Sequence, residues 1–180
     1  MKAKLARALA ERRYVRLQTH DPAGAHYDGY VAHLGRDFVA LRHAPNFQID
    51  GWQVLSRRFL RGVRDGRLEA TANEVLRMHG VDRRVKPPAW LLRCETFPEV
   101  IEAMGRRDIW PAIETLREGE DALYMGPLWS MDEQGVWIRA YSATGRWEKR
   151  YGLVWEDIVR VEWGSAYCGM FNAYMRTRAK

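Results

Sequence analysis

The residues best suited to chemistry in this chain are two histidines and two carboxylates near residues 20–28. His20 and His26 flank a turn that contains Asp21, and Asp28 follows closely. Imidazole and carboxylate groups are ordinary ligands of zinc and related metals, so this segment is one candidate metal site. The same residues are equally ordinary in an exposed polar loop, which is the interpretation that we favour. We therefore expect no bound metal.

Acidic residues are the remaining candidates for acid–base chemistry. Glu118, Glu120 and Asp121 lie in an expected hairpin loop, and Glu156 and Asp157 lie in an expected tight turn. General acid–base catalysis needs two groups in contrasting environments, and the sequence indicates none here. The chain also contains no GxSxG, GxxxxGK, HExxH or dinucleotide-binding glycine motif. We expect a protein that is not an enzyme, with no cofactor and no small-molecule substrate.

A cluster of arginines suggests a different chemistry, the binding of phosphate groups. The candidate nucleic-acid-binding residues are Arg57, Arg58, Arg61, Gly62 and Arg64. Alternate side chains of a strand point to opposite faces, so strand geometry alone does not align all four arginines. The alternative is a solvated basic edge that keeps this strand from pairing with other strands.

Charge is distributed unevenly along the 180 residues. Residues 1–90 hold 17 Lys and Arg against 9 Asp and Glu, whereas residues 91–180 hold 12 against 14. A basic half is typical of a polyanion partner and also of an Arg-rich solvated surface, and we favour the second interpretation. No stretch approaches the about 18 apolar residues of a membrane span. With no secretory signal and no cysteine framework, we expect a cytoplasmic location and no membrane contact.

Tryptophans concentrate in the second half of the chain. If Val136 and Ile138 face the interior of an expected strand, then Trp137 and Arg139 face outward. An exposed Trp beside Arg is suited to stacking on a base or on a side chain of a partner, so Trp137 and Arg139 are candidate contact residues. The alternative, which we favour, is that the rings seal the domain against neighbouring elements.

The chain repeats itself with an offset of 97 or 98 residues in three blocks, and with a small gap in a fourth. Four matching blocks follow one another in the same order, which indicates a duplication. The blocks are Tyr27-Asp28-Gly29 with Tyr124-Met125-Gly126, Val39-Ala40-Leu41-Arg42 with Val136-Trp137-Ile138-Arg139, Gly51-Trp52 with Gly145-Arg146-Trp147, and residues 60–66 with 158–164.

Short strands separated by Gly, Asp and Asn turns predict an antiparallel meander in each copy. We expect strands at 14–19, 29–34, 38–43, 52–56 and 59–64, and again at 112–116, 123–131, 136–141, 147–154 and 158–163. Helical spacing predicts a short helix before each copy and a second one after it, at 68–78 and 166–175. Pro87 and Pro88 mark a linker, so the expected divisions are 1–80, 81–95 and 96–180.

A short helix followed by a bent five-stranded meander resembles the Sm-like, SH3-like small barrel, and in particular bacterial proteins with two such barrels in tandem. The resemblance covers about residues 13–66 and 110–164. It implies a mainly β fold with short helices (α+β), built from two tandem five-stranded antiparallel barrels, each preceded by a short helix.

In the Sm family, RNA is bound by an Asp-x-x-Met-Asn stretch and by an Arg-Gly pair. Here Asp37 is followed by Ala40 and Leu41 at the Met and Asn positions, whereas Arg61-Gly62 resembles the Arg-Gly pair. The second copy has no glycine after Arg160. These features lead to two hypotheses. The first is a non-catalytic interaction module that binds a protein partner or self-associates, and the alternative is RNA binding through the basic first half.

Overall fold

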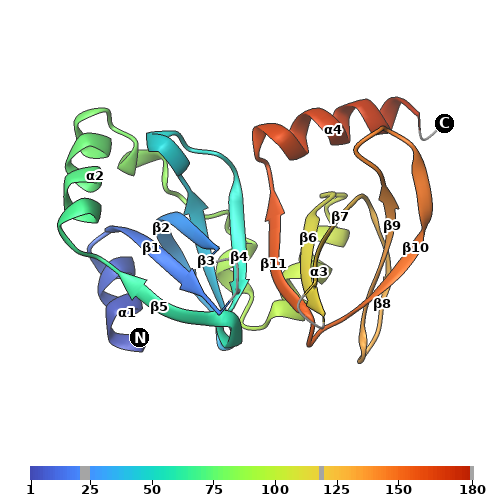
Figure 1. Cartoon of the computed structure of the whole chain (residues 1–180), viewed down its shortest axis with the longest axis horizontal. Coiled ribbons are helices and arrows are strands. Elements are labelled where there is room, and N and C mark those ends of the chain that lie inside the picture. The colour runs from blue at the N-terminus through green and yellow to red at the C-terminus, as the bar shows by residue number, and fades with distance from the viewer. Residues whose placement is uncertain (21–24, 118–119, 179–180) are drawn as a thin grey trace. The chain divides into compact units, whose positions relative to one another are not determined.

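The chain divides into two compact units, Met1–Phe97 and Pro98–Lys180. A computed structural model describes residues 1–20, 25–117 and 120–178 (Figure 1). The segment 81–95, expected to be a linker, belongs to the first unit, where Leu91 and Cys94 are buried.

The first unit is an antiparallel sheet flanked by two helices. Its strands are paired in the order β4-β3-β2-β1-β5. The main core cluster joins α1 to the sheet through Leu5 and Ala8, which pack with apolar residues such as Val15, Leu41 and Leu55. The elements are α1 (Lys2–Ala10), β1 (Tyr14–Thr19), β2 (His26–Leu34), β3 (Phe38–His43), β4 (Trp52–Ser56), β5 (Leu60–Arg64) and α2 (Arg67–Met78), with short 3-10 turns at Pro45–Phe47, Arg57–Phe59, Asp82–Arg84 and Leu91–Arg93.

The second unit has the corresponding strand order. Its strands are paired in the order β10-β9-β7-β6-β11, and β8 also pairs with β9. A core cluster under α4 contains Trp110, Met125, Tyr141, Cys168 and Met175. The elements are α3 (Phe97–Gly105), β6 (Ala112–Arg117), β7 (Glu120–Met125), β8 (Leu128–Met131), β9 (Gly135–Tyr141), β10 (Trp147–Val154), β11 (Ile158–Trp163) and α4 (Ala166–Thr177).

The predicted mainly antiparallel β architecture with short helices is confirmed. The expected closure into barrels is not found: among the described residues, β4 does not pair with β5 in the first unit, nor β10 with β11 in the second. The sheet of each unit is therefore open. The strand predicted at 123–131 is also divided into β7 and β8, because Pro127 has no N–H to donate to a neighbouring strand.

Each unit contains a glycine that another strand approaches closely. A β-carbon on Gly29 would lie 2.2 Å from the carbonyl oxygen of Arg42, and a β-carbon on Gly126 would lie 2.2 Å from that of Arg139. No side chain fits such a distance, so both positions require glycine. The two contacts recur at the same offset as the sequence repeat.

The helices that follow the sheets begin with hydrogen-bonded caps. The Glu69 carboxylate accepts a hydrogen bond from the Gly66 N–H at 2.9 Å before α2, and the Ser165 hydroxyl accepts one from the Cys168 N–H at 3.2 Å in α4. In the part of the chain that the structure describes, none of the helices has the length and apolar character needed to cross a membrane.

Candidate interaction surface

Strands β8, β9 and β10 lie side by side in the second unit, where β9 pairs with both of the others (Figure 1). Val136 and Ile138 of β9 are buried, whereas the alternate residues Trp137 and Arg139 are exposed. The structure therefore places both candidate contact residues on the outward side of this strand. We use the term outward face for the surface formed by Trp129, Trp137, Arg139, Arg150 and Val154.

Trp137 lies directly opposite Gly152 in the β9–β10 ladder. A β-carbon on Gly152 would be 3.1 Å from the Trp137 ring, so the ring covers the bare backbone of the neighbouring strand. An aromatic ring over a glycine is a stabilising cross-strand arrangement, and it fixes the ring in one orientation. Trp137 nevertheless remains 43% exposed.

Arg139 and Arg150 also lie directly opposite each other in this ladder. Each guanidinium stacks on a tryptophan: Arg139 Cζ is 4.4 Å from the Trp147 ring centroid, and Arg150 Cζ is 3.4 Å from that of Trp129. Neither arginine forms an ion pair within the described ranges. Like charges opposite each other destabilise a sheet, and stacking on the rings offsets part of that repulsion.

Beyond Arg139 and Arg150, the outward face is largely apolar. Trp129 is 54% exposed and Val154 is 43% exposed. A shallow hollow of about 220 Å³ lies beside Trp137, and Gly135, Gly152 and Val154 are among the residues that line it. A second hollow of about 270 Å³ lies between α3 and β8, with Trp129 at its border. Large exposed rings beside hollows are typical of surfaces that bind partners.

An acidic turn lies at the end of the outward face that is away from Arg139 and Arg150. The Asp132 carboxylate accepts hydrogen bonds from the N–H groups of Gln134 and Gly135, at 2.8 and 3.0 Å. The Trp155 indole N–H donates to the Asp132 carbonyl at 3.1 Å, which ties the turn to the end of β10. Glu133 is exposed next to it. The turn is thus rigid and carries two negative charges.

Two of the candidate nucleic-acid-binding arginines, Arg57 and Arg64, are hydrogen-bonded within the first unit. Arg57 Nε donates to the Phe38 carbonyl at 3.1 Å, and Arg64 Nε donates to the Glu69 carboxylate at 2.6 Å. The remaining two differ in their surroundings. Arg58 Cζ lies 4.8 Å from the centroid of the neighbouring Phe59 ring, whereas Arg61 is exposed and has no partner among the described residues.

Gly62 lies opposite Gln18 in the β1–β5 ladder. A β-carbon at this position would be 3.2 Å from the Gln18 side-chain oxygen. The lack of a side chain at Gly62 therefore suits the close packing of β5 against β1.

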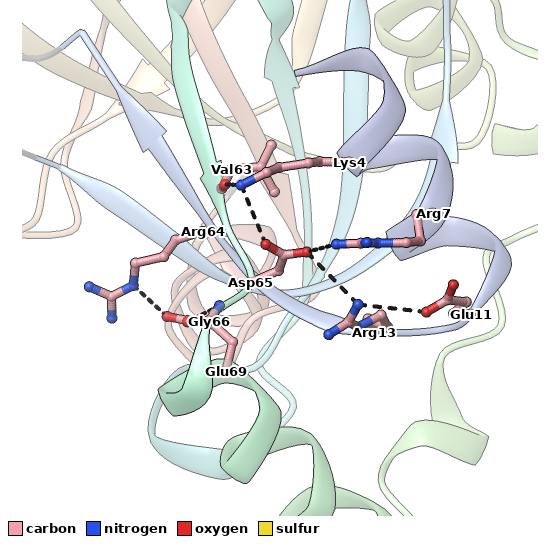
Figure 2. Close-up of polar contacts among 9 residues, drawn as sticks. All are labelled: Lys4, Arg7, Glu11, Arg13, Val63, Arg64, Asp65, Gly66 and Glu69. Atoms are coloured by element: carbon pink, nitrogen blue, oxygen red, sulfur yellow. Dashed lines mark hydrogen bonds and ion pairs between the residues drawn. The ribbon is translucent and has the colours of Figure 1, made fainter.

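A cluster of charges that the sequence did not predict joins α1 to the end of β5. Asp65 lies between three cations: Arg7 hydrogen-bonds its carboxylate, and the nitrogens of Lys4 and Arg13 lie 3.5 and 3.9 Å away (Figure 2). Lys4 also donates to the Val63 carbonyl at 3.3 Å. The hydrogen bond from Arg7 lowers the pKa of Asp65 despite the opposing effect of burial. The spacing of Lys4 and Arg7, three residues apart on one helix face, is the sequence feature that could have indicated this cluster.

In the candidate metal site, Asp28 is bonded to Arg16 and lies near His26. Asp28 receives two hydrogen bonds from Arg16, both at 2.7 Å, and His26 Nε2 lies 3.9 Å from the same carboxylate. Asp21 lies outside the described residues, as does Glu118 of the acidic loop. Within residues 1–20, 25–117 and 120–178, no three His, Cys, Asp or Glu side chains form a group that could hold a metal ion.

The two cysteines are buried, and their sulfurs are not joined in a disulfide. Burial raises the pKa of the Cys168 thiol to about 11, so this thiol stays protonated and unreactive at neutral pH.

No family model, no curated protein and no solved structure matches this chain. Its function must therefore be inferred from its own surfaces.

Proposed function

We propose that this protein is a non-catalytic interaction module, built from two tandem copies of a small Sm-like unit, which binds its partner through the outward face of β8–β10. The duplication is supported by the corresponding strand orders and by the matched close contacts at Gly29 and Gly126. The strand order β5-β1-β2-β3-β4 of the first unit is also compatible with an Sm-like fold in which the sheet remains open.

The observation that carries this proposal is the exposure of Trp129 and Trp137 beside the arginines Arg139 and Arg150. Trp and Arg are the residues most enriched at the energetic centres of interfaces, because they combine a large contact area with directional polar groups. On the outward face, the rings are already held in place by Gly152 and Arg150. Binding therefore requires little ordering of side chains, which favours affinity.

A non-catalytic role is supported by the sequence and by the use of the histidines. The chain contains none of the catalytic motifs sought above. His33 Nε2 lies 2.9 Å from the Cys94 carbonyl, and His43 Nδ1 lies 3.0 Å from the Asp28 carbonyl. Both rings thus contribute to packing between segments, where a general base would need access to a substrate.

The proposal is tested by affinity capture from native lysate, with the intact chain and with a Trp129→Ser/Trp137→Ser variant. A matched control is Met170→Ser, which removes an exposed apolar side chain from α4. We expect the wild type and the control to retain the same partner, and the double Trp variant to lose it. Equal capture by all three proteins would contradict the proposal.

Nucleic-acid binding by the first unit is the second candidate, and the exposed side chains of Arg61 and Arg67 favour it. Each phosphate contact releases counterions, so such binding must weaken steeply with salt. The test is a titration of mixed-sequence single-stranded RNA at two salt concentrations, with Arg58→Ala and Arg61→Ala. Submicromolar binding that weakens with salt and with Arg61→Ala would support this candidate, and absence of binding at low salt would refute it.

A further inference from the structure

We propose that the outward face of β8–β10 binds the same face of a second copy of this chain, so that the protein forms a two-fold symmetric dimer. This inference rests on the proposed function, because it names the partner of that binding surface. It is carried by two independent properties of the face, its charge pattern and its shape.

The charges of the outward face are separated along the strands. Arg139 and Arg150 form a positive end, while Asp132 and Glu133 form a negative end. The register places Gly135 opposite Val154 and Trp137 opposite Gly152 between these two ends. At about 3.4 Å per residue, the arginine pair lies about 14 Å from the beginning of β9, where the acidic turn ends.

Such a pattern is complementary to itself. A two-fold axis that lies in the plane of the interface, perpendicular to the strands, reverses the direction of the strands in the second copy. The acidic turn of each copy then lies over the arginine pair of the other, and the like-charge repulsion between Arg139 and Arg150 is relieved twice in one complex. A partner with uniform charge would satisfy only one end of the face and repel the other.

Glu148, two residues before Arg150, does not neutralise the arginine pair. Glu148 accepts a hydrogen bond from the Tyr151 hydroxyl at 3.1 Å. Tyr151 lies opposite Ile138, whose side chain is buried, and therefore belongs to the side of the sheet away from Arg150. The positive end of the outward face thus keeps its charge available for a partner.

The shape of the face is also complementary to itself. The exposed ring of Trp137 lies next to the hollow of about 220 Å³, whose lining continues to Asp132 and Gln134 of the acidic turn. Under the same two-fold rotation, Trp137 of each copy lies above the hollow of the other. Projection and hollow lie side by side near the centre of the face, as an interface formed from identical surfaces requires.

The expected dimer is weak and reversible. Because the face is formed by only five side chains on three strands, we expect it to bury less than the about 800 Å² that each partner contributes to a stable interface of standard size. We therefore expect a dissociation constant of about 10–100 µM, and an affinity that falls as salt screens the two charged contacts.

The test is sedimentation velocity of the full chain over roughly 1–500 µM, with two charge-reversal variants. Arg139→Glu/Arg150→Glu makes the positive end negative. Glu133→Arg/Gln134→Arg makes the turn positive and keeps Asp132, whose carboxylate holds the turn. Each variant alone presents like charges to a second copy of itself, whereas the two variants together present opposite charges at both contacts.

We expect the wild type to dimerise with increasing concentration, each variant alone to remain monomeric, and an equimolar mixture of the two to dimerise. Arg83→Glu is the matched control, since it reverses an exposed charge in the first unit, and it should dimerise as the wild type does. The rescue in the mixture excludes misfolding as the reason for the monomeric variants.

Three results would overturn the dimer: a monomeric wild type over the whole range, an Arg139→Glu/Arg150→Glu variant that dimerises like the wild type, or a mixture that stays monomeric. If the wild type is monomeric but captures another protein in a manner that depends on Trp129 and Trp137, the dimer fails and the proposed function stands. If it is monomeric and the double Trp variant captures partners equally well, both fail.

Discussion

Asn73 and Asn172 hold corresponding helices to their sheets through opposite ends of the side-chain amide. The Asn73 side-chain oxygen accepts a hydrogen bond from the Tyr14 N–H at 3.3 Å, whereas the Asn172 side-chain nitrogen donates to the Trp110 carbonyl at 2.9 Å. The reason lies in Pro111, which follows Trp110 and has no N–H to donate. In the second unit, the asparagine therefore bonds to the carbonyl of Trp110, the residue before Pro111.

This difference predicts that substitution by aspartate changes the free energy of unfolding differently at the two positions. Asn73→Asp keeps an oxygen that accepts from Tyr14, so we expect a change of less than about 0.5 kcal/mol in the free energy of unfolding. Asn172→Asp removes the donor and sets a carboxylate against the Trp110 carbonyl, which should cost about 1–3 kcal/mol. Urea unfolding at neutral pH measures both values, and equal losses would contradict this account of the two helices.

The close approaches at Gly29 and Gly126 predict strong effects of a single methyl group. In either Gly29→Ala or Gly126→Ala, the new β-carbon meets a backbone oxygen that is fixed by the neighbouring strand. We expect each variant to lose about 2 kcal/mol or more of stability in thermal unfolding.

Gly169→Ala in α4 is the matched control for these substitutions, because nothing lies within 4 Å of its added carbon. It should stabilise the protein by about 0.5–1 kcal/mol, since alanine loses less conformational freedom in a helix. A similar, small effect of all three substitutions would show that the strands do not approach as described.

The contacts of Asp65 predict a dependence of stability on pH. The folded-state pKa of this carboxyl lies below its ordinary value of 3.8, so its ion pairs stabilise the protein above that value. The contribution is lost as the pH falls through the lowered folded-state pKa. Because Lys4 and Arg7 are about half exposed, solvent screening limits it to about 1 kcal/mol.

The variant Asp65→Asn should therefore be less stable than the wild type at pH 7, by about that amount, and the difference should vanish near pH 2. Urea titrations at several pH values measure the difference directly. Arg61→Ala serves as a comparison, since it removes an exposed arginine of β5 that has no partner in the described part of the chain. A difference that persists unchanged at low pH would refute the role of the Asp65 charge.

Most strands were predictable because their signals are local. β1, β3, β4, β10 and β11 begin and end at the residues expected from alternation and turn residues. The division at Pro127 was missed because an extended apolar stretch continues across it. The open sheet was missed because closure depends on contacts between distant strands, which a local pattern does not encode.

The candidate surface was only partly predictable. Alternation along β9 gives the outward direction of Trp137 and Arg139. The pairing of Arg139 with Arg150 depends on a register shift between Trp147 and Arg150, which the sequence does not indicate. Similarly, the contact of Arg57 with Phe38 arises from tertiary packing, and that of Arg64 with Glu69 arises from the turn between β5 and α2. A sequence pattern alone could not separate these arginines from Arg61.

The central claim, that the outward face of β8–β10 is the binding surface of this protein, is tested most directly by hydroxyl-radical footprinting. Oxidation of Trp129 and Trp137 would be measured by mass spectrometry in purified protein at about 1 µM and at about 500 µM, relative to Met170, which is 68% exposed on α4. We predict that both tryptophans are oxidised readily in the dilute protein and are protected several-fold in the concentrated protein, while Met170 is unchanged. Equal oxidation of Trp129 and Trp137 in the two samples would contradict the claim.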